Sequence, residues 1–189
     1  MNLYLDALTR DDCQRARAWR NEGYDVGNLR TAKRLTEADQ DVFYDRLRQP
    51  GCPHRYFAVR IQPTGWVDET SMYSPAAELV AMAGLVDISP ENGTAEISLI
   101  VSPDCRGKGM GREAVRLVLV EAFDRLRILS VYGECYNCNP PEVLRFWQRL
   151  VNDWGGYDAC LPARKFWNGR QYSSFYFGWL AEAWRERAR

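Results

Sequence analysis

Residues 94–127 read TAEISLIVSPDCRGKGMGREAVRLVLVEAFDRLR. The stretch opens with an apolar run, 95–101, whose composition predicts a strand. A turn at 102–105 follows, then three alternating glycines, and then an amphipathic run, 112–126, that predicts a helix. A strand, a glycine-rich loop and a helix in this order are typical of a phosphate cradle. Glycine lets the backbone approach an anion closely, and a helix N-terminus presents unpaired N–H groups to it.

The spacing of Gly107, Gly109 and Gly111 distinguishes between kinds of phosphate loop. A P-loop requires G-x-x-x-x-G-K-[ST], and no Ser or Thr follows the glycines here. A dinucleotide-binding loop requires G-x-G-x-x-G, and the final x-x-G step is missing. What remains is R-x-x-G-x-G, from Arg106 to Gly111. We expect Lys108 and Arg112, together with Arg106, to add positive charge around this loop.

Length and composition limit the function classes. A chain of 189 residues with 46% hydrophobic and 26% charged residues suits one soluble domain spanning residues 1–189. Basic and acidic residues number 25 each, so the net charge is zero, which argues against a general nucleic-acid binder. No apolar run approaches the roughly 18 residues of a membrane helix, and the N-terminus lacks a signal-peptide pattern. We therefore expect a cytoplasmic protein.

The six cysteines are expected to be free thiols, because a chain of this size does not need a disulfide scaffold. Cys135-x-x-Cys138 is a single pair, and His54 is the one histidine. A zinc site needs more ligands at suitable spacing. A redox C-x-x-C should open a helix, whereas this one lies at a predicted strand end. Metal and redox use remain alternatives.

The hydrophobic periodicity predicts an α/β (α+β) chain. The predicted strands are 2–7, 56–61, 78–88, 95–101, 129–135, 164–167 and 171–179. The predicted helices are 9–21, 36–47, 112–126, 140–150 and a short helical tail at 181–189. Asn168-Gly169 predicts a type I′ turn between the last two strands. The polar connection 62–75 carries Trp66, Asp68 and Tyr73, and an acidic, aromatic loop would suit a cationic amine.

The R-x-x-G-x-G loop closely resembles the coenzyme A pyrophosphate loop of the GCN5-related N-acetyltransferase (GNAT) family. The order of the predicted elements is also similar to that of the family, over nearly the whole chain. Further motifs resemble its ribosomal-protein-alanine acetyltransferase-like (RimJ/RimL-type) branch. They are Thr9 with Asp12, Trp19-Arg20-Asn21, Ala95-Glu96-Ile97, an Asn at 137 or 139, and the turn at Asn168-Gly169-Arg170.

This resemblance implies a single GNAT domain with a mixed sheet that splays between the strands at about 95–101 and 129–135. It implies direct transfer of an acetyl group from acetyl-CoA to a primary amine, without a metal. The acceptor would be a small-molecule or peptide amine. A homodimer is a further partner that it suggests, and a membrane and nucleic acid are not expected partners. The residues implied for coenzyme binding are Leu99, Ile100, Val101, Arg106, Gly107, Lys108, Gly109, Met110, Gly111, Arg112, Asn137, Asn139, Phe146 and Trp147.

Catalysis needs a base that takes a proton from the amine. The resemblance implies Glu96 as that base, although the same carboxylate could instead only order the sheet. Glu134, on the strand across the splay, is a second candidate. The family's usual tyrosine acid is replaced here by Phe146 and Trp147. A proton for the leaving thiolate would then come from water, from backbone amides, or from one of Tyr132, Tyr136 and Tyr157.

Two other functions remain open on the sequence. One is a catalytically degenerate module that binds coenzyme A without turnover, which the missing tyrosine favours. The other is a nucleic-acid-modifying relative of the same fold, against which the neutral charge argues.

Overall fold

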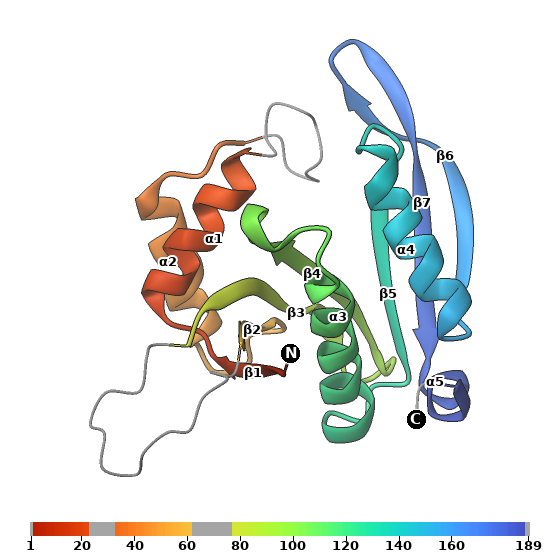
Figure 1. Cartoon of the computed structure of the whole chain (residues 1–189), viewed down its shortest axis with the longest axis horizontal. Helices are drawn as coiled ribbons and strands as arrows, with labels where there is room; N and C mark the ends of the chain where they lie inside the picture. The colour runs from red at the N-terminus through yellow and green to blue at the C-terminus, as the bar shows by residue number, and fades with distance from the viewer. Residues whose placement is uncertain (1, 23–32, 62–76, 188–189) are drawn as a thin grey trace.

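The computed structural model describes residues 2–22, 33–61 and 77–187. The described strands form one seven-stranded sheet in the order β1-β2-β3-β4-β5-β7-β6 (Figure 1). The strands are β1 (Leu3–Ala7), β2 (Arg55–Ile61), β3 (Leu79–Ser89), β4 (Thr94–Val101), β5 (Ser130–Tyr136), β6 (Tyr157–Trp167) and β7 (Arg170–Leu180). The helices are α1 (Arg10–Glu22), α2 (Glu37–Leu47), α3 (Met110–Val120), α4 (Pro141–Asp153) and α5 (Ala181–Arg187).

The first two helices begin at capping boxes that the sequence contains. The backbone N–H of Asp12 donates to the hydroxyl of Thr9, and the Asp12 carboxylate accepts from the Thr9 N–H. Thr36 and Asp39 repeat the arrangement at the start of α2. Each box satisfies N–H groups that the helix leaves without a partner. The predicted start of α1 next to Thr9 and that of α2 next to Thr36 are therefore confirmed.

The sheet opens between its two central strands. β4 and β5 are parallel, and their register contains only three pairs, from Thr94↔Ser130 to Glu96↔Tyr132. β4 continues to Val101 and β5 to Tyr136. On its other side β5 pairs with β7 along its whole length. The predicted splay is confirmed, and so is the predicted α/β class with a mixed sheet flanked by helices.

Helices cover both faces of the sheet. Ala114 and Val118 of α3 and Leu150 of α4 share the main apolar core with Ile97 of β4 and Phe177 of β7. Figure 1 shows α3 and α4 in front of the central strands. A smaller core on the opposite face joins α1 and α2 to the sheet through Cys13, Ala16, Met82, Phe43 and Ile100. At the splay, α3 and α4 therefore pack on one face of the sheet, and α1 and α2 pack on the other.

The C-terminal hairpin differs from its prediction at one end. β6 begins at Tyr157, whereas the predicted strand began at Arg164. The missed half is exposed along its length, so it carries no alternation of apolar and polar residues. A register shift between Leu161 and Lys165 also interrupts the strand. The turn at Asn168-Gly169 is confirmed, since both residues have positive φ, as type I′ requires.

The end of the cradle helix differs as well. α3 ends at Val120, and one π-helical turn, Glu121–Arg125, follows it. A π turn inside a helix does not change the hydrophobic periodicity noticeably, so the sequence predicts residues 112–126 as one helix. None of the described helices combines the length and the apolar composition that crossing a membrane requires.

Candidate active site

The glycine loop has the conformation that an anion cradle needs. Gly107 and Gly109 have φ of +73° and +80°, and no described atom lies within 4 Å of a Cβ built on either. The first hydrogen bond of the α3 ladder runs from the Glu113 N–H to the Gly109 carbonyl. The N–H groups of 110–112 therefore precede the ladder at the positive end of the helix. The loop offers open space lined by backbone donors, which fits a diphosphate.

The loop is tied to the open end of β4. The Nε of Arg106 donates to the carbonyl oxygen of Val101 at 3.3 Å. A Cβ built on Gly111 would lie 3.4 Å from Val101 and 3.5 Å from the ring of Phe146. Three elements, β4, α3 and α4, therefore meet at the mouth of the splay, next to the loop. The sequence predicted this loop but not the contact with α4.

The positive charges predicted around the loop have different surroundings. Arg112 forms an ion pair with Asp153, and its guanidinium lies 4.8 Å from the ring centre of Trp154. Arg112 therefore ties α3 to the end of α4. Lys108 lines a shallow cavity of about 220 Å³ with Met110 and Glu113.

Phe146 and Trp147 face the core side of the sheet. Their rings meet edge to face at 4.9 Å, and Trp147 stacks on Phe177 at 4.3 Å. Trp147 thus continues an aromatic row into β7, whereas Phe146 borders Gly111. The structure brings Phe146 to the glycine loop and places Trp147 against the sheet.

Both predicted carboxylates lie on the opposite face. Residues of a strand alternate between faces. Ile97, Val131 and Phe177 belong to the core below α3 and α4. Glu96 and Glu134, whose positions have the other parity, therefore lie on the face that α1 and α2 cover in part. Glu96 is 8% exposed and sits at the last β4–β5 pair, and Glu134 is two residues beyond that pair, where the strands have separated.

Tyrosines surround these two carboxylates. The hydroxyl of Tyr136 donates to Glu134 at 3.1 Å, and that of Tyr56 donates to Ser98 at 3.1 Å. Tyr132 stacks on Tyr176 with ring centres 5.4 Å apart. Burial, followed by the neighbouring tyrosines and both carboxylates, raises the pKa of Tyr176 to about 12. This face combines carboxylates with aromatic rings, which attract cations.

The remaining predicted residues lie at the two ends of β5. Asn137 donates its backbone N–H to Ser173, and the Asn139 side chain donates to the carbonyl of Tyr136 at 2.8 Å. Both asparagines therefore fasten the open end of β5. The hydroxyl of Tyr157 lies 3.3 Å from Ser130, at the closed end of the splay. Of the three tyrosines predicted as acids, only Tyr136 lies beside a candidate carboxylate at the open end.

The cysteines have the predicted free thiols. Burial raises the pKa of Cys135 to about 12, so its thiol stays protonated at neutral pH. Residues 2–22, 33–61 and 77–187 contain no group of three or more metal-ligating side chains that could hold an ion. Trp66, Asp68 and Tyr73 of the predicted acceptor loop lie outside the described residues.

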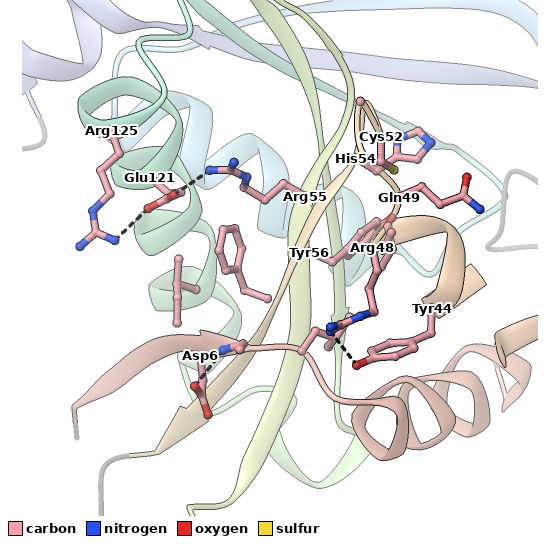
Figure 2. A pocket seen from close by; sticks show the side chains of 16 residues that line it. Asp6, Tyr44, Arg48, Gln49, Cys52, His54, Arg55, Tyr56, Glu121 and Arg125 are labelled. Atoms are coloured by element: carbon pink, nitrogen blue, oxygen red, sulfur yellow. Dashed lines mark hydrogen bonds and ion pairs between the residues drawn. The ribbon is translucent and has the colours of Figure 1, made fainter. Parts of the chain in front are cut away.

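A separate cavity of about 640 Å³ lies at the other end of α3, roughly 20 Å along the helix from the glycine loop. Figure 2 shows Glu121 of the π turn between Arg55 and Arg125, at 3.6 and 3.2 Å. Arg48 donates to the hydroxyl of Tyr44 on the opposite side. His54 also lines this cavity, and its Nδ1 accepts from the Asp87 N–H, which leaves the histidine away from the splay.

Sequence reasoning missed three residues of the carboxylate face. Tyr56, Tyr176 and Lys165 come from strands far apart in the chain, and no motif joins them. Parity along the strands could have found Tyr176, because it faces Glu134 in the β5–β7 register. The predicted turn at Asn168-Gly169 likewise sets Lys165 opposite Tyr172 on this face, although no motif pointed to it.

Comparisons with known proteins agree with this geometry. A model of the acetyltransferase (GNAT) domain family matches residues 2–144. The chain therefore belongs to the GNAT acetyltransferase family, and its activity is acetyl-CoA-dependent N-acetylation of an amine. Among curated proteins no match was found.

Solved structures with the same fold include mutant forms of the spermidine/spermine N-acetyltransferase SpeG from Vibrio cholerae. One has a TM-score of 0.76 at 20% identity, covering 99% of this chain and 98% of that one. A single-residue mutant of SpeG has a TM-score of 0.77 at 19% identity, with 99% and 98% covered. SpeG in complex with manganese ions has a TM-score of 0.70 at 19% identity, with 99% and 97% covered. At these identities the likeness concerns the fold.

Proposed function

We propose that this chain is a single acetyltransferase domain that transfers the acetyl group of acetyl-CoA directly to the primary amine of a small molecule. One observation supports the proposal most strongly. The glycine loop and the splay lie at the same end of β4, so a diphosphate on the loop would direct the rest of the coenzyme into the gap. The backbone of 99–101 has no β5 partner there, and the amides of a bound chain would satisfy it.

The coenzyme would be held by backbone more than by charge. The N–H groups of 107–112 would bind the diphosphate, with Arg106 and Lys108 beside them. Phe146 would contact the coenzyme at the mouth of the splay, and Asn137 and Asn139 would keep β5 apart from β4. Arg112 and Trp147 would act indirectly, because each is already engaged with α4 or β7.

We assign the base role to Glu134, supported by Glu96. Glu134 lies beyond the last β4–β5 pair, in the open part of the gap, and the Tyr136 hydroxyl orients it. It would take a proton from the acceptor ammonium, after which the neutral amine attacks the thioester carbonyl. Glu96 lies at the closed end and would add negative potential that attracts a cationic acceptor. Tyr136 is the phenol best placed to return a proton to the leaving thiolate.

The acceptor we favour is a cationic polyamine. The carboxylates and tyrosines of the face support a cation, and the structural neighbours are spermidine and spermine acetyltransferases. A peptide N-terminus, as the RimJ/RimL-type branch would use, is the second candidate, supported by the Ala95-Glu96-Ile97 and Trp19-Arg20-Asn21 motifs. A cytoplasmic location accords with both acceptors.

The test mixes the protein with acetyl-CoA and a thiol-detecting dye. Separate reactions contain spermidine, an alanine-starting peptide, or no amine. Amine-dependent thiol release supports the enzyme, and the faster acceptor decides between the two candidates. Coenzyme A binding by calorimetry, without release for any amine, would support the module that binds without turnover. Glu134→Gln is the matched variant, since it keeps the shape and removes the base.

A further inference from the structure

Lys165 of β6 lies over the carboxylate face. Its Nζ is 4.6 Å from the ring centre of Tyr136 and 5.6 Å from that of Trp167. The hydroxyl of the same Tyr136 donates to Glu134. The amine therefore occupies an aromatic cation site next to the candidate base, at the open end of the splay. A bound acceptor amine would need the same surroundings.

The register of the hairpin sets this placement. Next to the Asn168-Gly169 turn, Trp167 pairs with Arg170 of β7 and Lys165 pairs with Tyr172, which puts Lys165 on the face of Glu134 and Tyr136. The next pair is Leu161 with Ser174, so three residues of β6, 162–164, stand opposite one residue of β7 and form a bulge. Ala163, within the bulge, has a φ of +52°. Bulges are frequent beside active sites, and this one borders Lys165.

The amine is also in a state that suits reaction. Burial lowers the pKa of Lys165, while Cys138 and Glu134 act in the opposite direction. A larger share of its amine is therefore neutral at a given pH than in an exposed lysine. Both groups contact Tyr136, and the charge of Glu134 acts on the amine, so Glu134 is the carboxylate to which we assign receipt of its proton, directly or through water.

We propose that Lys165 is an acetyl acceptor of the enzyme itself. This inference rests on the proposed function, because it uses the same thioester and the same base. The Nζ ammonium loses one proton to Glu134, and the neutral amine attacks the thioester carbonyl carbon. The new C–N bond forms as the C–S bond breaks. The nitrogen then loses its second proton, the thiolate takes up one proton, and Glu134 releases the proton it received to solvent. Acetyl-lysine and free coenzyme A are the products, and no other reactant is needed.

Acetylation would change the charge of the acceptor face. The lysine cation beside Glu134 repels a cationic acceptor, and its neutral amide would not. Self-acetylation would thus raise the affinity of the site for polyamines.

The small number of lysines makes an acetylated lysine easy to assign. Only three of the 25 basic residues are lysines, at positions 33, 108 and 165. Lys33 forms an ion pair with Asp39 at 2.7 Å on the helical side, and Lys108 is in the glycine loop. Each lysine has separate surroundings, so peptide mapping assigns an acetyl group without ambiguity.

The full chain is incubated with acetyl-CoA alone, and its intact mass and tryptic peptides are followed. We expect close to one acetyl group per chain, on Lys165, at a rate independent of protein concentration. Lys165→Arg should abolish the mass shift, and Lys33→Arg should leave it unchanged. Glu134→Gln should slow it at least tenfold. A urea-unfolded sample measures chemical acetylation by acetyl-CoA.

Several results would overturn the proposal. They are an unmodified Lys165, equal labelling of all three lysines, a rate proportional to protein concentration, or the same rate in the unfolded sample. A parallel reaction with spermidine separates this proposal from the proposed function. Thiol release with spermidine but no label on Lys165 refutes self-acetylation and leaves the transferase intact. If spermidine causes no thiol release and Lys165 carries no label, both the proposed function and self-acetylation are refuted.

Discussion

Gly111 in the first turn of α3 lies against Phe146 of α4, such that a Cβ on the glycine would stand 3.5 Å from the ring. The same Cβ would lie 3.4 Å from Val101. This contact sets how closely the two helices approach at the mouth of the splay. The three alternating glycines therefore serve two purposes, since Gly107 and Gly109 provide positive φ, and Gly111 leaves a space that a methyl group would fill and that a larger side chain would not fit.

Gly109→Ala should weaken coenzyme A binding about five- to thirtyfold. The left-handed conformation costs an alanine about 1–2 kcal/mol. In the free protein the exposed loop can relax out of this conformation, so the cost reduces the free energy of coenzyme binding. Isothermal titration calorimetry measures the change. Gly51→Ala is the matched control, because Gly51 has a similar φ of +76° and no described atom near its Cβ. It should lower stability and leave the affinity unchanged. Equal affinities for both variants would contradict the cradle.

Gly111→Ala should be tolerated, since its Cβ contacts are close to ordinary van der Waals distances. Gly111→Val should instead push Phe146 and Val101 apart and weaken coenzyme binding at least tenfold. The branched side chain has no room between β4 and α4 without a shift of one of them. Calorimetry of the two variants, beside a thermal unfolding curve, separates lost binding from lost folding. If Gly111→Ala and Gly111→Val bind coenzyme A equally well, the contact between Gly111 and Phe146 does not affect coenzyme binding.

Substitutions of Phe146 and Trp147 should affect different properties, coenzyme binding and stability respectively. Trp147→Leu should reduce stability by about 2–4 kcal/mol, because it leaves a cavity against Phe177. Phe146→Leu should mainly raise the KM for acetyl-CoA, since its ring borders the loop. Urea unfolding and steady-state kinetics provide the two readouts. The reverse pattern would exchange the roles that we assign to the two rings.

Glu134→Gln should lower kcat at least a hundredfold, because it removes the base. Glu96→Gln should act mainly on the KM of a cationic acceptor, through lost attraction. Steady-state kinetics of each variant, compared with the wild type, distinguish the two. A kcat that Glu134→Gln leaves unaltered, but Glu96→Gln lowers, would assign the base to Glu96.

The free energy of unfolding should fall as pH rises above about 9. Burial raises the pKa of Cys13 to about 11 and that of Cys135 to about 12, from 9.0. Between these values the folded chain holds protons that the unfolded chain has released, so alkali favours unfolding. Stability from this source is complete below about pH 9 and is lost progressively toward pH 11. Urea titrations on both sides of pH 9 measure it. The Cys13→Ala variant should show a shallower decline, and an unchanged slope would contradict this cause.

The sequence alone determined the elements with strong local signals. The capping residues Thr9 and Thr36 are satisfied within their own first turns, so neighbours in the chain suffice to place α1 and α2. The glycine loop and the turn at Asn168-Gly169 follow equally from local backbone requirements. The resemblance to a known family then supplied the splay, which no periodicity contains. The start of β6 was placed wrongly, because an exposed strand with a bulge has no pattern of period two.

Tertiary structure decided which residues share the candidate site. Parity could place Glu96 and Glu134 on one face, but only the three-pair register between β4 and β5 puts Glu134 in the open gap. Lys165 reaches Tyr136 because β6 and β5 both pair with β7, and Phe146 reaches Gly111 because two helices pack together. Such contacts join segments far apart in the chain. They depend on the packing of whole elements, which the local sequence does not encode.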